Sequence, residues 1–292
     1  IGKSVVMEWK GQTVNPRHTL LNEDSNKLSL LDQSEGNLIY EFDLTKEKIL
    51  QRLEPDDYFI RDISKTSGKN VLSENILAVS EQTIHYFDQR QKNANCKNRE
   101  YKSNPQFNKI HGVDQESFVI GSQTGDLRFY SKFGQNSKNM IPAPNKEPVL
   151  CMDTSKDGRL LLITYRSCLL LLPTFQKSRS AFDYSFKKGE KPSPYILRVH
   201  PKTLVRNGVD RIVFNSGHFD EKSKKGESFI VGVADNLLVF WSLSAILEGN
   251  LVSSTIKKTE ERLIDSKFVY DTDDLVMAFE NKLSLQLNQS DL

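Results

Sequence analysis

The sequence contains few cysteines, and their spacing does not predict disulfide bonds or a shared metal site. Only three occur in 292 residues, Cys96, Cys151 and Cys168. An odd count without a short repeated spacing argues against a disulfide framework and against a zinc knuckle. Cys151 and Cys168 lie inside apolar runs, where a thiol packs as a small hydrophobic side chain. A reducing compartment fits this usage best, so we expect a cytoplasmic protein.

Long hydrophobic runs are also missing. The most apolar stretch, residues 160–172, is interrupted by Arg166 and is far shorter than the roughly 20 residues of a membrane-spanning helix. Residues 1–10 carry Lys3, Glu8 and Lys10 and have no signal-like apolar core. The sequence therefore predicts a soluble chain. Whether a targeting segment lies upstream of it is left open.

Neither sign of charge predominates. The chain has 40 basic and 38 acidic residues, a net charge of +2. Binding to nucleic acid needs a concentrated positive face, and near-neutrality removes that expectation. With 37% hydrophobic and 27% charged residues, we expect a globular domain with a well-solvated surface.

Patterns that carry chemistry are missing as well. No Gly-x-Ser-x-Gly occurs, and the five histidines show no ligand spacing. The acidic groups at residues 54–57 and 271–274 fit turns between strands better than calcium sites. We therefore predict a protein without catalytic residues, cofactor or metal. A hydrolase with His, Asp or Glu side chains clustered at the mouth of a central channel is the less favoured alternative.

One layout recurs along the chain: an apolar run, a short polar turn and a second apolar run of about five residues. Each copy predicts a β-hairpin, because the runs are rich in Leu, Val, Ile, Phe and Tyr and the turns in Asn, Ser, Gly, Asp and Glu. The six copies cover residues 20–32, 77–88, 119–131, 160–173, 231–242 and 276–287.

The spacing of the hairpins predicts the architecture. Their ends lie 56, 43, 42, 69 and 45 residues apart, and three of these gaps match the roughly 40–45 residues of a four-stranded propeller blade. We attribute the other two gaps to long loop inserts near residues 45–75 and 176–228. The prediction is an all-β, closed, WD40-like β-propeller of six or seven blades of four-stranded antiparallel sheet. It is a single domain over residues 1–292, with residues 1–10 as a ring-closing strand, and a pair of β-sandwiches is the rival architecture.

Seven short segments carry a more specific pattern. They are Leu-Asn-Glu-Asp-Ser at 21–25, Phe-Asp-Gln-Arg at 87–90, Gly-Asp-Leu-Arg-Phe at 125–129, Phe-Gly-Gln-Asn-Ser-Lys at 133–138, Asp-Gly-Arg at 157–159, the leucines of 169–172 and Val-Phe-Trp-Ser at 239–242. In this order and spacing they resemble a known family, the C-terminal propeller of the vacuolar import and degradation protein twenty-seven family of eukaryotes. The similarity runs from about Leu20 to about Leu287.

The resemblance implies a cytoplasmic WD40-like propeller without known enzymatic activity, whose parent proteins carry a pleckstrin-homology-like region upstream. This sequence departs from the family pattern at Gln89, at Tyr130-Ser131 and at Pro173. Trp-Asp strand ends are therefore missing, and structural Asp–His networks, if present, are expected in only some blades.

We predict a non-enzymatic protein-interaction scaffold, related to vesicle traffic or protein turnover, that acts as a monomer and does not bind nucleic acid. The alternative is a peripheral membrane protein that contacts anionic lipid through basic loops. Arginine on rigid strands or turns is typical of interface hot spots, and lysine-rich inserts favour acidic partners. The candidate partner-binding residues are Arg128, Arg159, Lys187, Lys188, Lys191, Lys222, Lys224 and Lys225.

Overall fold

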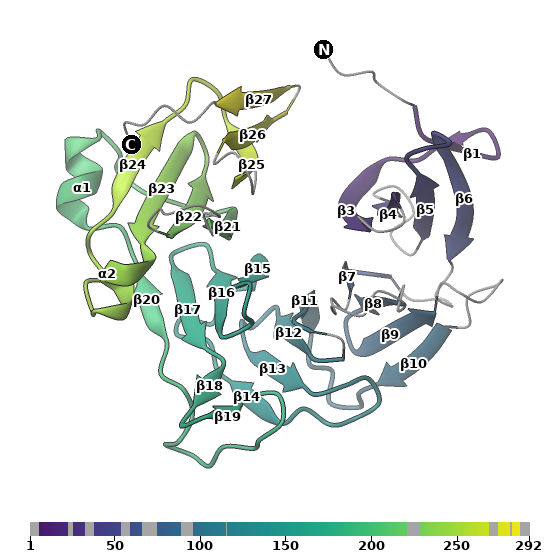
Figure 1. Cartoon of the computed structure of the whole chain (residues 1–292), viewed down its shortest axis with the longest axis horizontal. Coiled ribbons are helices and arrows are strands. Elements are labelled where there is room, and N and C mark those ends of the chain that lie inside the picture. The colour runs from purple at the N-terminus through teal and green to yellow at the C-terminus, as the bar shows by residue number, and fades with distance from the viewer. Residues whose placement is uncertain are drawn as a thin grey trace. The chain divides into compact units, whose positions relative to one another are not determined.

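The computed structural model describes residues 6–22, 26–32, 38–53, 59–65, 75–88, 96–114, 116–220, 228–268, 274–280 and 282–286. Within these ranges nearly all regular structure is antiparallel β-sheet (Figure 1). The chain divides into two compact units, an N-terminal unit (Ile1–Pro142) and a C-terminal unit (Ala143–Leu292). Each unit contributes three successive sheets.

The N-terminal unit forms three four-stranded sheets whose strands follow one another in chain order. The first sheet contains β3 (Pro16–Asn22), β4 (Lys27–Asp32), β5 (Ile39–Asp43) and β6 (Lys48–Leu53). The second contains β7 (Asp62–Lys65), β8 (Asn75–Val79), β9 (Thr83–Asp88) and β10 (Cys96–Glu100). The third contains β11 (Phe107–Gly112), β12 (Phe118–Ser122), β13 (Leu127–Tyr130) and β14 (Asn139–Ile141).

The C-terminal unit repeats this plan. The fourth sheet contains β15 (Cys151–Thr154), β16 (Leu160–Thr164), β17 (Leu169–Pro173) and β20 (Tyr195–Leu197). The fifth contains β21 (Ser216–Asp220), β22 (Phe229–Ala234), β23 (Leu237–Ser242) and β24 (Thr255–Lys258). In the described residues the sixth has three strands, β25 (Leu263–Phe268), β26 (Leu275–Phe279) and β27 (Leu283–Gln286).

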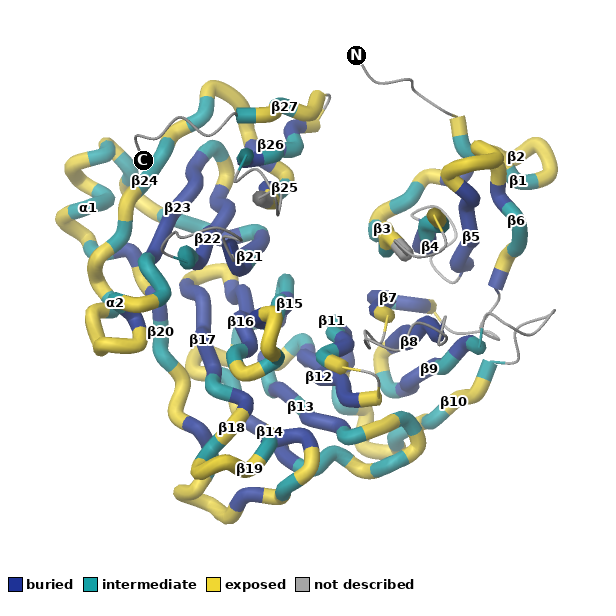
Figure 2. The backbone as a smooth tube through the Cα atoms, in the orientation of Figure 1, coloured by how far each residue is buried: buried dark blue, intermediate teal, exposed yellow. Residues whose placement is uncertain are grey.

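Within each unit the hydrophobic core lies in layers between consecutive sheets. In the N-terminal unit, Leu31 and Ile39 of the first sheet pack with Phe87 of the second. In the C-terminal unit, Leu169 of the fourth sheet packs in one cluster with Trp241 of the fifth. Central strands are apolar along their whole length because both of their faces are covered. Figure 2 shows this for β16, β17 and β23, which are mostly buried.

In the described residues these sheets are six blades of a β-propeller, three in each unit, so the predicted all-β propeller class is confirmed with six blades. All six predicted hairpins are present. Five of them join the second and third strands of a sheet, but the first joins β3 to β4, the first and second strands. The equivalent hairpin of the first sheet is β4–β5, which ends at Asp43. From there to Asp88 the gap has the ordinary blade length.

Both predicted inserts contain regular structure. Residues 45–75 include β6 and β7, which belong to the first and second sheets. Residues 176–228 include β20, the fourth strand of the fourth sheet, and helix α1 (Pro201–Arg206). Helix α2 (Leu243–Leu247) follows β23. No helix in the described residues is long and apolar enough to cross a membrane.

The described part of the N-terminal segment forms a hairpin of its own. Strand β1 (Glu8–Trp9) pairs with β2 (Gln12–Thr13). Met7 and Trp9 pack against the first sheet, where the Trp9 ring lies 6.3 Å from the ring of Tyr40. Residues 1–5 lie outside the described ranges, and pairing of this segment with the last blade stays a prediction.

Candidate functional site

Within each unit, the first strands of neighbouring sheets contact one another through polar side chains. In the N-terminal unit β7 lies beside both β3 and β11, and in the C-terminal unit β21 lies beside both β15 and β25. We call these the inner strands. They bring together titratable residues that are far apart in the sequence.

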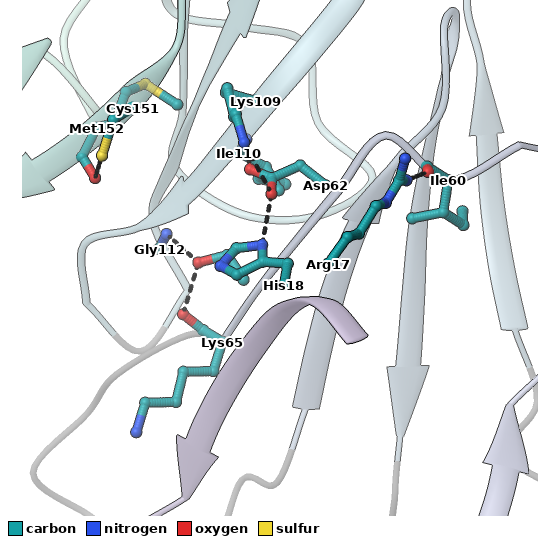
Figure 3. A network of polar contacts seen from close by, with 11 residues as sticks. Arg17, His18, Ile60, Asp62, Lys65, Lys109, Ile110, Gly112, Cys151 and Met152 are labelled. Carbon is teal, nitrogen blue, oxygen red and sulfur yellow. Dashed lines mark hydrogen bonds and ion pairs between the residues drawn. The ribbon is translucent and has the colours of Figure 1, made fainter. Parts of the chain in front are cut away.

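Asp62 on β7 is the centre of the inner-strand network in the N-terminal unit (Figure 3). Its side chain is 4% exposed, and its carboxylate lies 2.6 Å from Nδ1 of His18 on β3 and 3.5 Å from Nζ of Lys109 on β11. The backbone N–H of Ile110 also donates to it, at 3.0 Å. Burial disfavours the ionised form, but Lys109 and His18 outweigh burial and lower the pKa of Asp62.

His218 on β21 is the centre of a corresponding network in the C-terminal unit. Its Nε2 lies 2.8 Å from the Asp265 carboxylate on β25, and its Nδ1 lies 3.7 Å from that of Asp153 on β15. Ser216 also donates to Asp265, at 2.6 Å. Burial disfavours the imidazolium, but the bonds to Asp153 and Asp265 outweigh it and raise the pKa of His218 well above its ordinary value.

These contacts tie neighbouring blades together. A buried Asp that accepts a backbone N–H and faces a cation satisfies the polar groups of two strands at once. Cys151 lies in the same region, but burial raises the pKa of its thiol, which opposes formation of a nucleophilic thiolate. The described residues contain no group of three or more His, Cys, Asp or Glu that could hold a metal ion.

Gly217 allows β21 to approach the fourth sheet closely. A Cβ at this position would lie 2.7 Å from Cδ2 of Leu169 and 2.8 Å from Oγ1 of Thr164. Both of these side chains are fully buried. The Gly217-His218 pair of the fifth sheet thus contacts the sheets on both sides. Gly217 fits against the fourth sheet, and His218 binds Asp265 on β25, the first strand of the sixth sheet.

Sequence reasoning treated the histidines as dispersed and missed these ties. The fold brings His18 to Asp62 and His218 to Asp265, so Asp–His contacts join the first sheet to the second and the fifth sheet to the sixth. An aspartate recurs in the strand that precedes three of the hairpins, at Asp62, Asp153 and Asp265. That recurrence is the signal in the sequence.

Arg128, a predicted partner-binding residue, lies on β13 and is half-buried. Its Nε is enclosed and makes no hydrogen bond with a described residue. Burial and the contact with Tyr101 raise the pKa of Tyr130, while the charges of Arg128 and Arg99 oppose that rise. Arg128 and Arg99 thus both act on Tyr130, and the Arg99 guanidinium lies 5.3 Å from the ring centre of Tyr101.

Arg159, the second predicted arginine, is exposed in the turn between β15 and β16. Its guanidinium lies 5.5 Å from the ring centre of Phe175. Phe175 belongs to a small hairpin of β18 (Phe175–Gln176) and β19 (Arg179–Ser180), which we call the insert hairpin. In the same segment, Arg179 lies 4.3 Å from the ring centre of Tyr184.

The predicted lysines lie partly outside the described residues. Lys187 and Lys188 are exposed and Lys191 is half-buried. Residues 187–190 form a turn, in which the backbone N–H of Lys187 donates to the Glu190 carboxylate at 3.4 Å. Lys222, Lys224 and Lys225 fall in residues 221–227 and are not described. The convergence of the two lysine groups therefore stays a prediction.

Comparison with known proteins identifies close to the whole chain with one family. The model of the VID27 C-terminal WD40-like domain matches residues 3–291. Vacuolar import and degradation protein 27 of Saccharomyces cerevisiae is 24% identical over 94% of this chain and 37% of its own length. The protein of the same name from Schizosaccharomyces pombe is 21% identical over 94% of this chain and 36% of its own length. The chain thus spans little more than a third of these curated relatives.

Among solved structures, a chain of a crystal structure of the mitotic checkpoint complex is similar in fold. The TM-score is 0.65 at 12% sequence identity, over 95% of this chain and 78% of that one. At this identity the likeness concerns the fold alone.

Proposed function

Because the chain belongs to the family of the VID27 C-terminal WD40-like domain, we propose that it is a non-enzymatic protein-interaction scaffold of the cytoplasm. Its role would lie in the import and turnover of proteins for which the relatives are named. In this proposal the six blades close into a ring, and loops on that ring recognise partner proteins. The chain works as a monomer, and recognition needs no chemistry beyond contact.

The observation that carries the proposal is the contrast between the inner strands and the insert hairpin. The inner-strand carboxylates are engaged with neighbouring strands, as Asp62 and Asp265 are. The insert hairpin instead exposes Arg179 and part of the Phe175 ring, and Arg159 is exposed in the turn before β16. Arginine and aromatic residues are the types most enriched at interface hot spots.

Affinity capture tests the scaffold role. The chain would be immobilised and exposed to eukaryotic lysate, with mass spectrometry of what it retains. We expect a small reproducible set of proteins, retained by the wild type and released by free chain in solution. Retention of the same proteins by a heat-unfolded sample would reject a role that depends on the fold.

Lipid contact is the second candidate, and the exposure of Lys187 and Lys188 supports it. Each lysine near an anionic membrane surface contributes about 1 kcal/mol. Glu190 at the same turn reduces the local charge. Flotation with phosphatidylserine vesicles tests this candidate. Binding to the vesicles that disappears in K187A/K188A and in high salt supports lipid contact. If no protein binds the vesicles at low salt, lipid contact is excluded.

A further inference from the structure

We propose that the outer edge of the N-terminal unit, between its second and third sheets, binds a phosphorylated side chain of a partner protein. The site consists of two arginines and two tyrosines, Arg99, Arg128, Tyr101 and Tyr130. All four belong to the same compact unit. The proposal rests on the scaffold function above and names the chemistry of the partner.

The strand register places Arg128 and Tyr130 on one face of the third sheet. On β13, Arg128 lies opposite Ile120 of β12, and Tyr130 lies opposite Phe118. Side chains of directly opposite residues lie on the same face of a sheet. Ile120, Phe118 and Tyr130 all belong to the hydrophobic cluster between the second and third sheets. Arg128 and Tyr130 therefore face the second sheet.

The second sheet directs Arg99 toward the same cluster. Arg99 on β10 lies opposite Ile84 of β9, which belongs to that cluster. Its guanidinium donates to Oδ1 of Asn136, between β13 and β14 of the third sheet, and lies 5.3 Å from the ring centre of Tyr101. Tyr101 packs on the cluster as well, with its ring 5.4 Å from that of Phe107 on β11. Two faces that pack on each other thus bring the four side chains together.

Three enclosed polar atoms of this group make no hydrogen bond with a described residue. They are the hydroxyls of Tyr101 and Tyr130 and Nε of Arg128. Tyr130 is fully buried, and burial and the contact with Tyr101 raise its pKa. Its hydroxyl therefore stays protonated and able to donate. A buried donor without an acceptor is unfavourable, so three such atoms together indicate that acceptor oxygens of another molecule complete the site.

The local charge favours a phosphate group. Arg99 and Arg128 form no ion pair with a described residue. The acidic residues nearest to them in the sequence, Glu100 and Asp126, each accept a hydrogen bond from another side chain, at 2.6 and 3.3 Å. A phosphoserine carries about 1.5 to 2 negative charges and three strong acceptor oxygens, which matches two guanidinium groups and three unused donors. A carboxylate supplies one charge and two oxygens.

The site is reachable from solvent. Strands β10 and β14 are the outermost strands of the second and third sheets. Arg99, Tyr101 and Arg128 are only half-buried. Met140 of β14, which lies opposite Arg128, is 42% exposed. A partner side chain can therefore approach the arginines from the outer edge and reach toward the buried Tyr130 hydroxyl.

Fluorescence anisotropy with peptide mixtures of defined chemistry tests the site. Three labelled mixtures share randomised flanking positions and differ at one central residue, which is phosphoserine, serine or glutamate. We expect the full chain to bind the phosphoserine mixture at least about tenfold more tightly than the serine mixture. R99A/R128A should abolish most of this preference. The control K202A/R206A removes the same charge from exposed positions on α1 and should keep the preference within about twofold.

Two further variants separate the geometry of the site from its charge. R99K/R128K keeps both charges and the apolar stems but loses the planar groups, and we expect it to weaken phosphoserine binding at least about threefold. Y130F removes only the buried hydroxyl. It should weaken phosphoserine binding about threefold without lowering the melting temperature, because that hydroxyl has no partner in the free protein. Thermal melts show that each variant is folded.

Several results would overturn the proposal. They are equal affinity for the phosphoserine and serine mixtures, equal affinity for the phosphoserine and glutamate mixtures, equal losses in R99A/R128A and K202A/R206A, and wild-type binding in Y130F. Arginine-dependent binding to vesicles with phosphatidylinositol phosphate, without binding of the phosphoserine mixture, would assign the site to a lipid headgroup instead. If wild type and R99A/R128A capture the same lysate proteins before and after phosphatase treatment, the scaffold function stands and this site fails.

Discussion

Asp62 and Asp153 make the same two contacts in different blades. The carboxylate of Asp62 accepts the N–H of Ile110 at 3.0 Å, and that of Asp153 accepts the N–H of Phe219 at 2.9 Å. In each case the residue before that N–H is basic and faces the same carboxylate, at 3.5 Å for Lys109 and 3.7 Å for His218. One aspartate thus ties the first strand of its own blade to the first strand of the next.

Removing the Asp62 carboxylate should destabilise the N-terminal unit. Asp62→Ala leaves His18, Lys109 and the Ile110 N–H without their shared acceptor, and we expect a loss of about 3 kcal/mol in the free energy of unfolding. Urea unfolding at neutral pH measures it. Asp183→Asn, at an exposed position, is the control and should change stability by less than about 0.5 kcal/mol.

The contribution of Asp62 should also depend on pH. Its pKa is lowered in the folded state, so its stabilisation is present above the unfolded pKa of about 3.9 and is lost as pH falls through the lower folded value. The stability difference between wild type and Asp62→Ala should therefore shrink on acidification. A difference that stays constant from neutral to strongly acidic pH would contradict this role.

His218 should make stability fall toward alkaline pH. Its folded-state pKa lies well above the ordinary histidine value of about 6.5, so its stabilisation is complete below about 6.5 and is lost as pH rises through the folded value. Asp153 and Asp265 face the imidazole as carboxylates, and the buried Cys151 thiol has a raised pKa. Melting temperatures measured from mildly acidic to alkaline pH should decline in the wild type.

His218→Gln provides the comparison for this decline. The variant retains a hydrogen-bonding side chain but does not titrate. Its melting temperature should therefore be lower than that of the wild type at mildly acidic pH and should change less across the same pH range. Identical pH profiles for wild type and variant would show that other groups govern the decline.

Gly217→Ala should destabilise the C-terminal unit through overpacking. The new methyl group would meet Leu169 and Thr164 below van der Waals distance, and we expect a cost of about 1–3 kcal/mol. Chemical unfolding measures it. Because Leu169→Ala opens space at the same contact, Gly217→Ala should cost less in that background, and strictly additive effects would argue against a direct clash.

The hairpins were predictable because they are local. The run Leu-Leu-Leu-Ile-Thr at 160–164, the turn after it and the leucines of 169–172 specify β16 and β17 without reference to the rest of the chain. The number of blades could not be predicted from the spacing of the hairpins. The first hairpin joins β3 to β4 rather than the second and third strands, and sequence spacing cannot distinguish these two placements.

The inner-strand ties and the insert hairpin were not predictable in the same way. His18 and Asp62 are 44 residues apart and meet at 2.6 Å only because β3 and β7 become neighbours. Arg159 was chosen from the sequence as an exposed arginine on a turn, and it is exposed. Its aromatic neighbour Phe175 lies after the next hairpin, and the contact depends on how β18 folds back.

The amino-acid sequence by itself determined the strands, their turns and the family to which the chain belongs, because apolar runs, turn residues and motif order act over short distances. Tertiary structure alone decided which titratable groups meet, which of them burial perturbs, and which arginines stack on aromatic rings. Those properties arise from packing one sheet on the next, and the energy of a buried charge depends on neighbours that are distant in the sequence.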